Sequence, residues 1–161
     1  MIEAWLAALE ATTVAKALRD SVYVYPLVNT GHLIGVALVV GSIIPLDLRL
    51  LWAWPSVPLA PLWQVLTRTA AAGLVLAVVF GSLLFITRAT EYAASGLFIS
   101  KMAVVAAATL NALALRVISR GEILRVLSTT QKPPRRLRIA GGFSLVAWIT
   151  ALTLGRMVGY F

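Results

Sequence analysis

One histidine and two methionines are the side chains of this sequence best suited to bind a soft metal ion. His32 is the single histidine, and Asn29, three residues earlier, lies on the same face of a helix. If the chain crosses a membrane four times, Met102 and Met157 lie at a depth similar to that of His32. A neutral imidazole with two thioethers suits Cu(I), and one His with one Met can ligate haem iron. The alternatives are a histidine hydrogen-bonded to Asn29 or to a backbone carbonyl across a helix interface, and a proton or substrate site.

Other polar side chains interrupt or end the apolar runs of the sequence. Lys101 lies about one turn inside a run, so its amine must reach outward or pair with Glu91. Asn111 is expected to hydrogen-bond a neighbouring helix. A further group of charged residues stands where runs end on one side, and we expect it to combine stop signals with ion pairs. Its members are Asp47, Arg49, Arg68 and Arg116.

No catalytic pattern accompanies these groups. The sequence has no cysteine, no Ser/His/Asp arrangement with matching spacing and no glycine-rich phosphate loop. It has no pair of carboxylates within an apolar run, and its connections are too short to build an exposed pocket. We therefore expect a protein that is not an enzyme.

The composition identifies the class of protein in which these residues must be placed. Of the 161 residues, 60% are hydrophobic and 12% are charged, whereas soluble domains have roughly 45–50% and about 25%. This excludes an ordinary soluble domain, a disordered tail and a disulfide scaffold, and favours a single transmembrane domain over residues 1–161. The net charge of +8 is explained by one basic connection, so we expect the bilayer as partner and no nucleic acid.

Charged residues bound four apolar runs, each long enough to cross a bilayer as a helix. The expected spans are about 23–46, 66–87, 96–118 and 138–159. Residues 2–19 are expected to form an amphipathic helix that lies at the outer membrane surface, the alternative being a flexible tail. The predicted fold class is therefore all-α, an integral membrane four-helix bundle with an N-terminal interfacial helix.

The distribution of basic residues predicts the orientation of these spans. Seven of the 14 Lys and Arg residues lie between 116 and 138, around the connection 119–137. Because cytoplasmic loops carry an excess of Lys and Arg, this connection is expected in the cytoplasm and both termini on the outer side.

Small residues recur at intervals of four along the spans, which allows close approach of helix backbones. The glycines expected at helix contacts are Gly31, Gly35, Gly73, Gly81 and Gly155. Gly31 and Gly35 form a G-x-x-x-G motif. Two uses are open, packing within the bundle and formation of a homodimer.

Four segments between residues 25 and 116 resemble a family of small, uncharacterised bacterial inner-membrane proteins that is distantly similar to the membrane domain of copper-resistance protein D. The segments are Asn29-Thr30-Gly31-His32-Leu33-Ile34-Gly35, Pro45-Leu46-Asp47-Leu48-Arg49-Leu50, Phe98-Ile99-Ser100-Lys101-Met102 and Asn111-Ala112-Leu113-Ala114. The resemblance implies a four-helix bundle in the bacterial inner membrane, with His32 and Lys101 at family positions. Copper-handling members are expected to carry several His or Met ligands, whereas this chain has one His and three Met.

Three hypotheses of function follow. The leading one is a non-enzymatic integral membrane subunit or accessory protein that acts through helix packing, in a homo-oligomer or a larger membrane complex. The second is a copper- or haem-handling protein that uses His32, with Met102 or Met157 assisting. The third is a small-solute or proton transporter, placed last because no acidic residue is expected near the middle of the membrane. The first hypothesis requires no cofactor.

Overall fold

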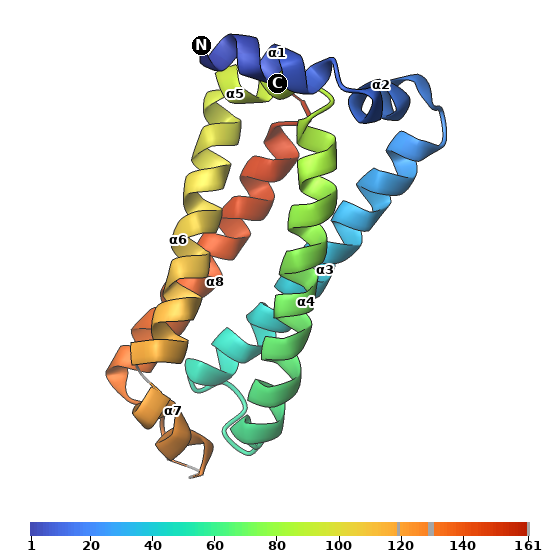
Figure 1. Cartoon of the computed structure of the whole chain (residues 1–161). Coiled ribbons are helices and arrows are strands. Elements are labelled where there is room, and N and C mark those ends of the chain that lie inside the picture. The colour runs from blue at the N-terminus through green and yellow to red at the C-terminus, as the bar shows by residue number, and fades with distance from the viewer. Residues whose placement is uncertain (119, 129–130, 161) are drawn as a thin grey trace.

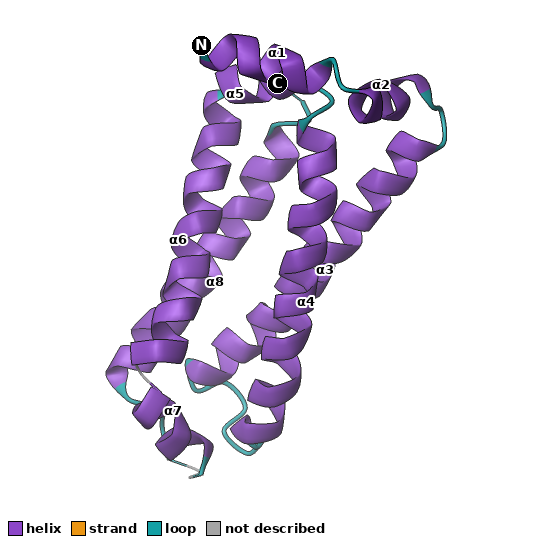
Figure 2. Ribbon diagram, in the orientation of Figure 1, coloured by secondary structure: helices purple, strands orange, loops and turns teal. Residues whose placement is uncertain are grey.

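The computed structural model describes residues 1–118, 120–128 and 131–160, which form eight helices and no strand. The helices are α1 (Ile2–Glu10), α2 (Thr13–Asp20), α3 (Val24–Leu50), α4 (Leu59–Phe85), α5 (Ala89–Ala94), α6 (Gly96–Ile118), α7 (Arg120–Leu127) and α8 (Arg135–Met157). Figure 1 shows their order along the chain, and Figure 2 shows that short loops join them. The all-α fold class expected from the sequence is confirmed.

Four of these helices, α3, α4, α6 and α8, are long and apolar enough to cross a membrane. This fits a membrane protein with a bundle of four helices. The helix α6 has the expected bounds, but α3 continues past residue 46 to Leu50 and α4 begins at Leu59 rather than near 66. Charged residues end an apolar run without ending the helix, because a helix can continue wherever its backbone hydrogen bonds are made.

The long helices pack in the order α4, α3, α8, α6. The helix α3 packs against both α4 and α8, and α8 also packs against α6. The buried share of the most apolar 18-residue stretch differs among the four long helices. It is 39% in α3 and 33% in α8, but only 6% in α4 and in α6. The central helices α3 and α8 therefore carry the interior of the protein, and α4 and α6 flank it.

Short helices cover one end of the bundle, here called the α1 end, where α1 lies across α5 (Figure 1). The expected single helix over 2–19 is divided at Thr12, whose hydroxyl accepts a hydrogen bond from the backbone of Ala15 and begins α2. The carboxylate of Glu10 accepts two hydrogen bonds of 2.7 Å from Thr90, one from its backbone N–H and one from its hydroxyl. The N-terminal segment is thus fastened to the connection between α4 and α6.

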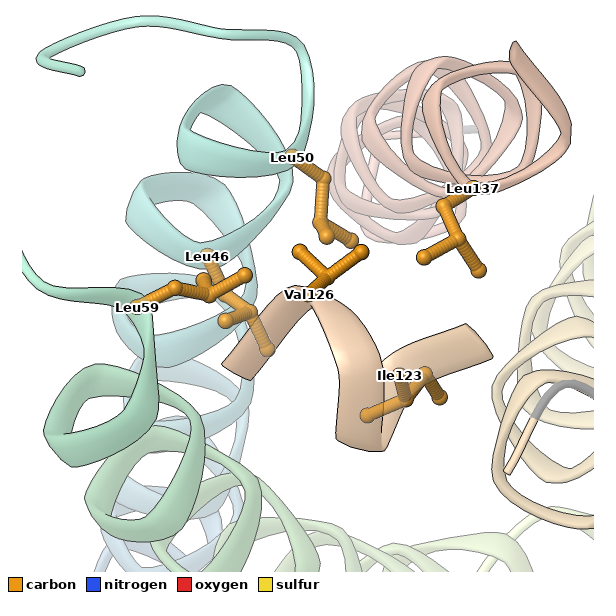
Figure 3. Packing of buried hydrophobic residues seen from close by; sticks show 6 residues of the cluster. All are labelled: Leu46, Leu50, Leu59, Ile123, Val126 and Leu137. Atoms are coloured by element: carbon orange, nitrogen blue, oxygen red, sulfur yellow. The ribbon is translucent and has the colours of Figure 1, made fainter. Parts of the chain in front are cut away.

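The opposite end, here called the α7 end, holds a cluster of buried aliphatic side chains (Figure 3). Its members come from α3, α4, α7 and α8, and they are Leu46, Leu50, Leu59, Ile123, Val126 and Leu137. Closely packed aliphatic side chains hold each other through many van der Waals contacts. This cluster therefore ties α7 to the ends of three long helices.

The glycines expected at helix contacts lie at such contacts. A Cβ atom added at any of them would approach a side chain or backbone of another helix to 3.4 Å or less. The glycines and their neighbours are Gly31 with Phe80, Gly35 with Ala77, Gly73 with Leu38, Gly81 with His32, and Gly155 with Lys101. The G-x-x-x-G motif of α3 therefore packs against α4 of the same chain.

Candidate functional site

His32 lies in the half of α3 nearer the α1 end, half-buried against α4. Its Nδ1 is 2.8 Å from the carbonyl oxygen of Ala77, and its ring lies over Gly81, where a Cβ atom would be 3.0 Å from Cε1. Because a carbonyl accepts hydrogen bonds, Nδ1 carries the proton and Nε2 of the neutral ring keeps a lone pair. The expected backbone carbonyl across a helix interface is the partner, and the alternative partner, Asn29, is exposed.

Lys101 lies on α6 and extends across α8. Its Cε would be 3.4 Å, and its Nζ 3.6 Å, from a Cβ atom placed on Gly155. Of the two arrangements expected for its amine, reaching outward or pairing with Glu91, the pairing is not formed, because Glu91 instead pairs with Arg88 at 3.3 Å. His32 therefore packs against α4, whereas Lys101 packs against α8.

Met102 and Met157, which were expected to complete a metal site with His32, lie at the surface of the bundle. Met102 is 47% exposed and Met157 is 38% exposed. Lys101 of α6 and Gly155 of α8 lie at the contact between these two helices. One residue along a helix is a rotation of about 100°, so Met102 points away from the direction of Lys101, and Met157, two residues after Gly155, points about 200° away from it. His32 alone offers one free imidazole nitrogen. Among the described residues no group of three or more His, Cys, Asp or Glu side chains could hold a metal ion.

Asp47 is the buried carboxyl group of the bundle interior. It lies on α3 with 4% of its surface exposed, and its backbone carbonyl oxygen would be 3.5 Å from a Cβ atom placed on Gly141 of α8. The side-chain oxygen Oδ2 has no hydrogen-bond partner in the described part of the chain. No Lys or Arg nitrogen of those residues lies within 4 Å of it. A carboxyl group buried in this way is costly to keep ionised without a partner.

The ion-pair cluster expected around Asp47 is therefore not formed. Arg49 donates from Nε to the carbonyl of Val57 at 2.8 Å and from Nη2 to that of Pro55 at 3.2 Å. It also lies over the ring of Trp52 at 5.2 Å. Two residues along a helix correspond to a rotation of about 200°, so Arg49 faces the loop while Asp47 faces α8. Arg68 and Arg116 are exposed.

Asn111 makes the interhelical hydrogen bond that was expected of it. Its amide nitrogen donates to the carbonyl of Ala140 on α8 at 3.1 Å. This bond joins α6 and α8 one turn before Ser144 in the sequence of α8. It has a structural role in this contact.

Sequence reasoning missed Ser144 and Trp148, which lie one turn apart on the buried face of α8. Trp148 is 6% exposed, and its Nε1 has no hydrogen-bond partner among residues 1–118, 120–128 and 131–160. The sequence did contain a signal for this buried face, because its residues follow one another at alternating intervals of four and three positions along the helix. The buried positions with that spacing are Leu137, Gly141, Ser144, Trp148 and Ala151.

The arrangement offers two chemically distinct groups in the interior. The carboxyl group of Asp47, with one free oxygen, lies toward the α7 end, and the imidazole of His32 lies toward the α1 end. Both kinds of group bind and release protons. No protein-family model matches the sequence, and no curated protein or solved structure matches it either.

Proposed function

We propose that this protein moves protons through the membrane, with Asp47 as the side chain that takes up and releases them. The observation that carries the proposal is the burial of this carboxyl group without a cation. Ionisable residues inside membrane helices are rare because burying their charge is costly, and where they occur they mark proton or substrate pathways. This raises the third hypothesis from the sequence above the other two.

The neighbours of Asp47 support proton exchange with the α7 end. Asp47 lies three residues before the end of α3 at Leu50, so the path from the carboxyl to the membrane surface is short. Three other buried polar atoms without a partner among the described residues belong to side chains of this end, on Arg49, Glu122 and Arg138. Polar atoms of this kind are the ones that ordered water satisfies.

His32 supplies a second proton-exchanging group nearer the α1 end. Its Nε2 lone pair can accept a proton while Nδ1 keeps its hydrogen bond to Ala77. We place the α7 end in the cytoplasm and the α1 end outside a bacterial inner membrane, on the basis of the positive-inside rule and the family resemblance.

The test is proton flux in vesicles that contain the purified protein. Vesicles loaded with potassium and a pH-sensitive dye are diluted into low-potassium buffer, and valinomycin then sets a membrane potential that drives protons inward. We expect acidification with the wild type and its loss with Asp47→Asn, which keeps the size of the side chain but cannot ionise. Asp20→Asn is the matched control, because Asp20 is exposed at the end of α2.

Two outcomes contradict the proposal. One is a wild-type flux no faster than that of protein-free vesicles, and the other is an unchanged flux in Asp47→Asn. Circular dichroism and thermal unfolding in detergent show whether each variant is folded before its flux is compared.

A specific observation also favours the leading hypothesis from the sequence, an accessory subunit that packs against another membrane helix. A shallow groove of about 320 Å³ lies between α6 and α8, and small side chains form much of it. Its lining residues are Ala103, Val104, Ala107, Phe143, Val146, Ala147 and Thr150. Small residues are typical of surfaces where membrane helices approach closely.

Cross-linking in native membranes tests this second function. Filling the groove with Ala107→Leu is expected to abolish a cross-linked product, whereas Ala106→Leu, at an exposed position outside the groove, leaves it unchanged. The same product with both variants would exclude the groove as the contact. None of the contacts that His32 makes favours the hypothesis of a copper- or haem-handling protein.

A further inference from the structure

Arg156 lies near the end of α8 and is the first charged residue after a long uncharged stretch. Residues 139–155 carry no charge, and α8 is long and apolar enough to cross a membrane. The last turn of α8 lies at the α1 end of the bundle (Figure 1). An arginine at such a position extends its guanidinium toward the level of the lipid headgroups, because its charge is costly to keep in the hydrocarbon.

The guanidinium of Arg156 is held by Tyr160, four residues further along the chain. Its Nη2 donates a hydrogen bond to the phenol oxygen, and its Cζ lies 4.7 Å from the centre of the tyrosine ring. A guanidinium has five N–H donors, and no carboxylate oxygen of the described residues lies within 4 Å of this one. The cation is therefore held by a neutral side chain and lacks an anion from the described part of the chain.

A concavity of about 600 Å³, here called the Arg156 concavity, lies beside this pair on the surface of α8 and the residues that follow it. It is lined by Leu152, Thr153, Arg156, Met157 and Tyr160. The Thr153 hydroxyl already donates to the carbonyl of Ile149 within its own helix, so most of the wall is apolar. Leu152 precedes Arg156 by four residues, which is about 6 Å along a helix. The apolar wall therefore extends from the cation toward the middle of the membrane.

The chemistry of the Arg156 concavity favours one of the molecules that could cover it in a membrane. A neighbouring transmembrane helix would have to enclose the arginine charge, and the wall offers Leu152 and Met157 rather than the small residues typical of helix contacts. A dissolved anion would pair with the guanidinium but leave the apolar wall uncovered, whereas a phospholipid supplies both a phosphate and an acyl chain. Among the described residues no acidic side chain lines the concavity, so it favours a headgroup with a net negative charge.

We propose that the Arg156 concavity binds an anionic phospholipid. The lipid phosphate accepts hydrogen bonds from the N–H groups of Arg156 that do not bond Tyr160, in the paired geometry that a guanidinium offers to phosphate. The Tyr160 hydroxyl, which accepts from Arg156, keeps its own proton to donate to a second phosphate oxygen. An acyl chain lies along Leu152 and Met157, which are 40% and 38% exposed.

Photo-cross-linking of the full-length protein in phosphatidylcholine vesicles tests this site. The vesicles contain a trace of phosphatidylglycerol or of phosphatidylcholine, each with the same photoactivatable acyl chain, and mass spectrometry measures the label on residues 150–160. This local readout separates the Arg156 concavity from the basic residues at the α7 end. We expect about tenfold more label from phosphatidylglycerol, the factor that corresponds to one additional interaction with a charged group.

Matched variants show which groups hold the lipid. Arg156→Gln is expected to lower the phosphatidylglycerol label to the level of phosphatidylcholine. Lys16→Gln removes a positive charge from an exposed position of α2 at the same end of the bundle and is expected to leave the label unchanged. Tyr160→Phe keeps the ring and removes the hydroxyl, so its label should lie between those of the wild type and Arg156→Gln.

Competition distinguishes a lipid from a dissolved anion. Unlabelled phosphatidylglycerol should displace the photoactivatable lipid, whereas dissolved glycerol phosphate, which cannot cover the apolar wall, should not. Circular dichroism and thermal unfolding show that each variant is folded before its label is compared.

Three results would each overturn the proposal: equal labelling by the two lipids in the wild type, an unchanged label in Arg156→Gln, and displacement by glycerol phosphate. Because the measurement involves no proton gradient, its outcome is independent of the proposed role of Asp47 in proton flux.

Discussion

Gly35 of α3 and Gly73 of α4 face each other so closely that a Cβ atom on either would lie 2.8 Å from the carbonyl oxygen of the other. The contact is between backbones, so no flexible side chain can move away to make room. It fixes the crossing of α3 and α4, and with it the position of Ala77, whose carbonyl accepts the hydrogen bond from His32.

Gly35→Ala is therefore expected to destabilise the protein by about 1–3 kcal/mol, the usual cost of overpacking. Its Cβ atom would lie 2.5 Å from the backbone nitrogen of Ala77. Gly41→Ala on the same helix is the control, because a Cβ atom at Gly41 would meet no atom of another helix within 4 Å. Alanine also favours the helix over glycine by up to about 1 kcal/mol. Thermal unfolding in detergent measures the stability of both variants. Equal stability of Gly35→Ala and Gly41→Ala would show that the crossing of α3 and α4 tolerates a methyl group.

Glu10→Gln is expected to loosen the N-terminal segment in a pH-dependent way. The hydrogen bonds from Thr90 stabilise the ionised carboxylate and hold the pKa of Glu10 below its ordinary value. A carboxyl with a lowered pKa stabilises the folded state above the pKa of the unfolded chain, and this stabilisation is lost as the pH falls through the folded-state pKa.

Hydrogen exchange of the α1 amides measures this effect at matched pH. At neutral pH the Gln variant should exchange faster than the wild type, and the two should converge well below the ordinary value of 4.5. Glu3→Gln, at an exposed position of the same helix, should match the wild type at every pH. A constant difference across the pH range would show that the charge of Glu10 is not the cause.

Arg49→Lys is expected to destabilise the connection between α3 and α4 by about 2 kcal/mol, because hydrogen bonds to a charged group contribute that much. The planar guanidinium of Arg49 donates to two carbonyl groups and also lies over the ring of Trp52. The ammonium of a lysine is not planar and cannot make all three contacts at once. Arg68→Lys, at an exposed position of α4, should have no effect. Thermal unfolding with limited proteolysis of the loop checks both variants.

Asn111→Ala is expected to cost about 0.6 kcal/mol, the average for a hydrogen bond between membrane helices. It removes the bond to Ala140 that joins α6 and α8. Thr150→Ala removes a hydroxyl that bonds within its own helix, to Val146, and should have a smaller effect. A loss of several kcal/mol in Asn111→Ala would indicate a larger polar network at this contact.

The orientation can be tested with single cysteines, because the natural sequence has none. A membrane-impermeant maleimide added to intact cells should label Glu3→Cys and should label Lys132→Cys only after the cells are lysed. Both positions are exposed in the protein, so burial does not explain a difference. The reverse pattern would place the α7 end outside.

The sequence by itself determined that the chain forms four long apolar helices and that several glycines lie at helix contacts. These follow from the length of the apolar runs and from the small size of glycine, which are local properties. The bounds of α6 were predictable for the same reason, whereas α3 and α4 extend beyond their apolar runs because Asp47 and Pro61 are accommodated within helices.

Only the tertiary structure decided which polar groups meet. Partner choice depends on the order of the helices and on their rotation about their axes, and neither is encoded in the spacing along one helix. Thus Nδ1 of His32 lies 2.8 Å from the carbonyl oxygen of Ala77 on α4, and Asp47 is buried in the bundle with no arginine of the described residues within 4 Å. The placement of α3 beside both α4 and α8 brings about each of these contacts.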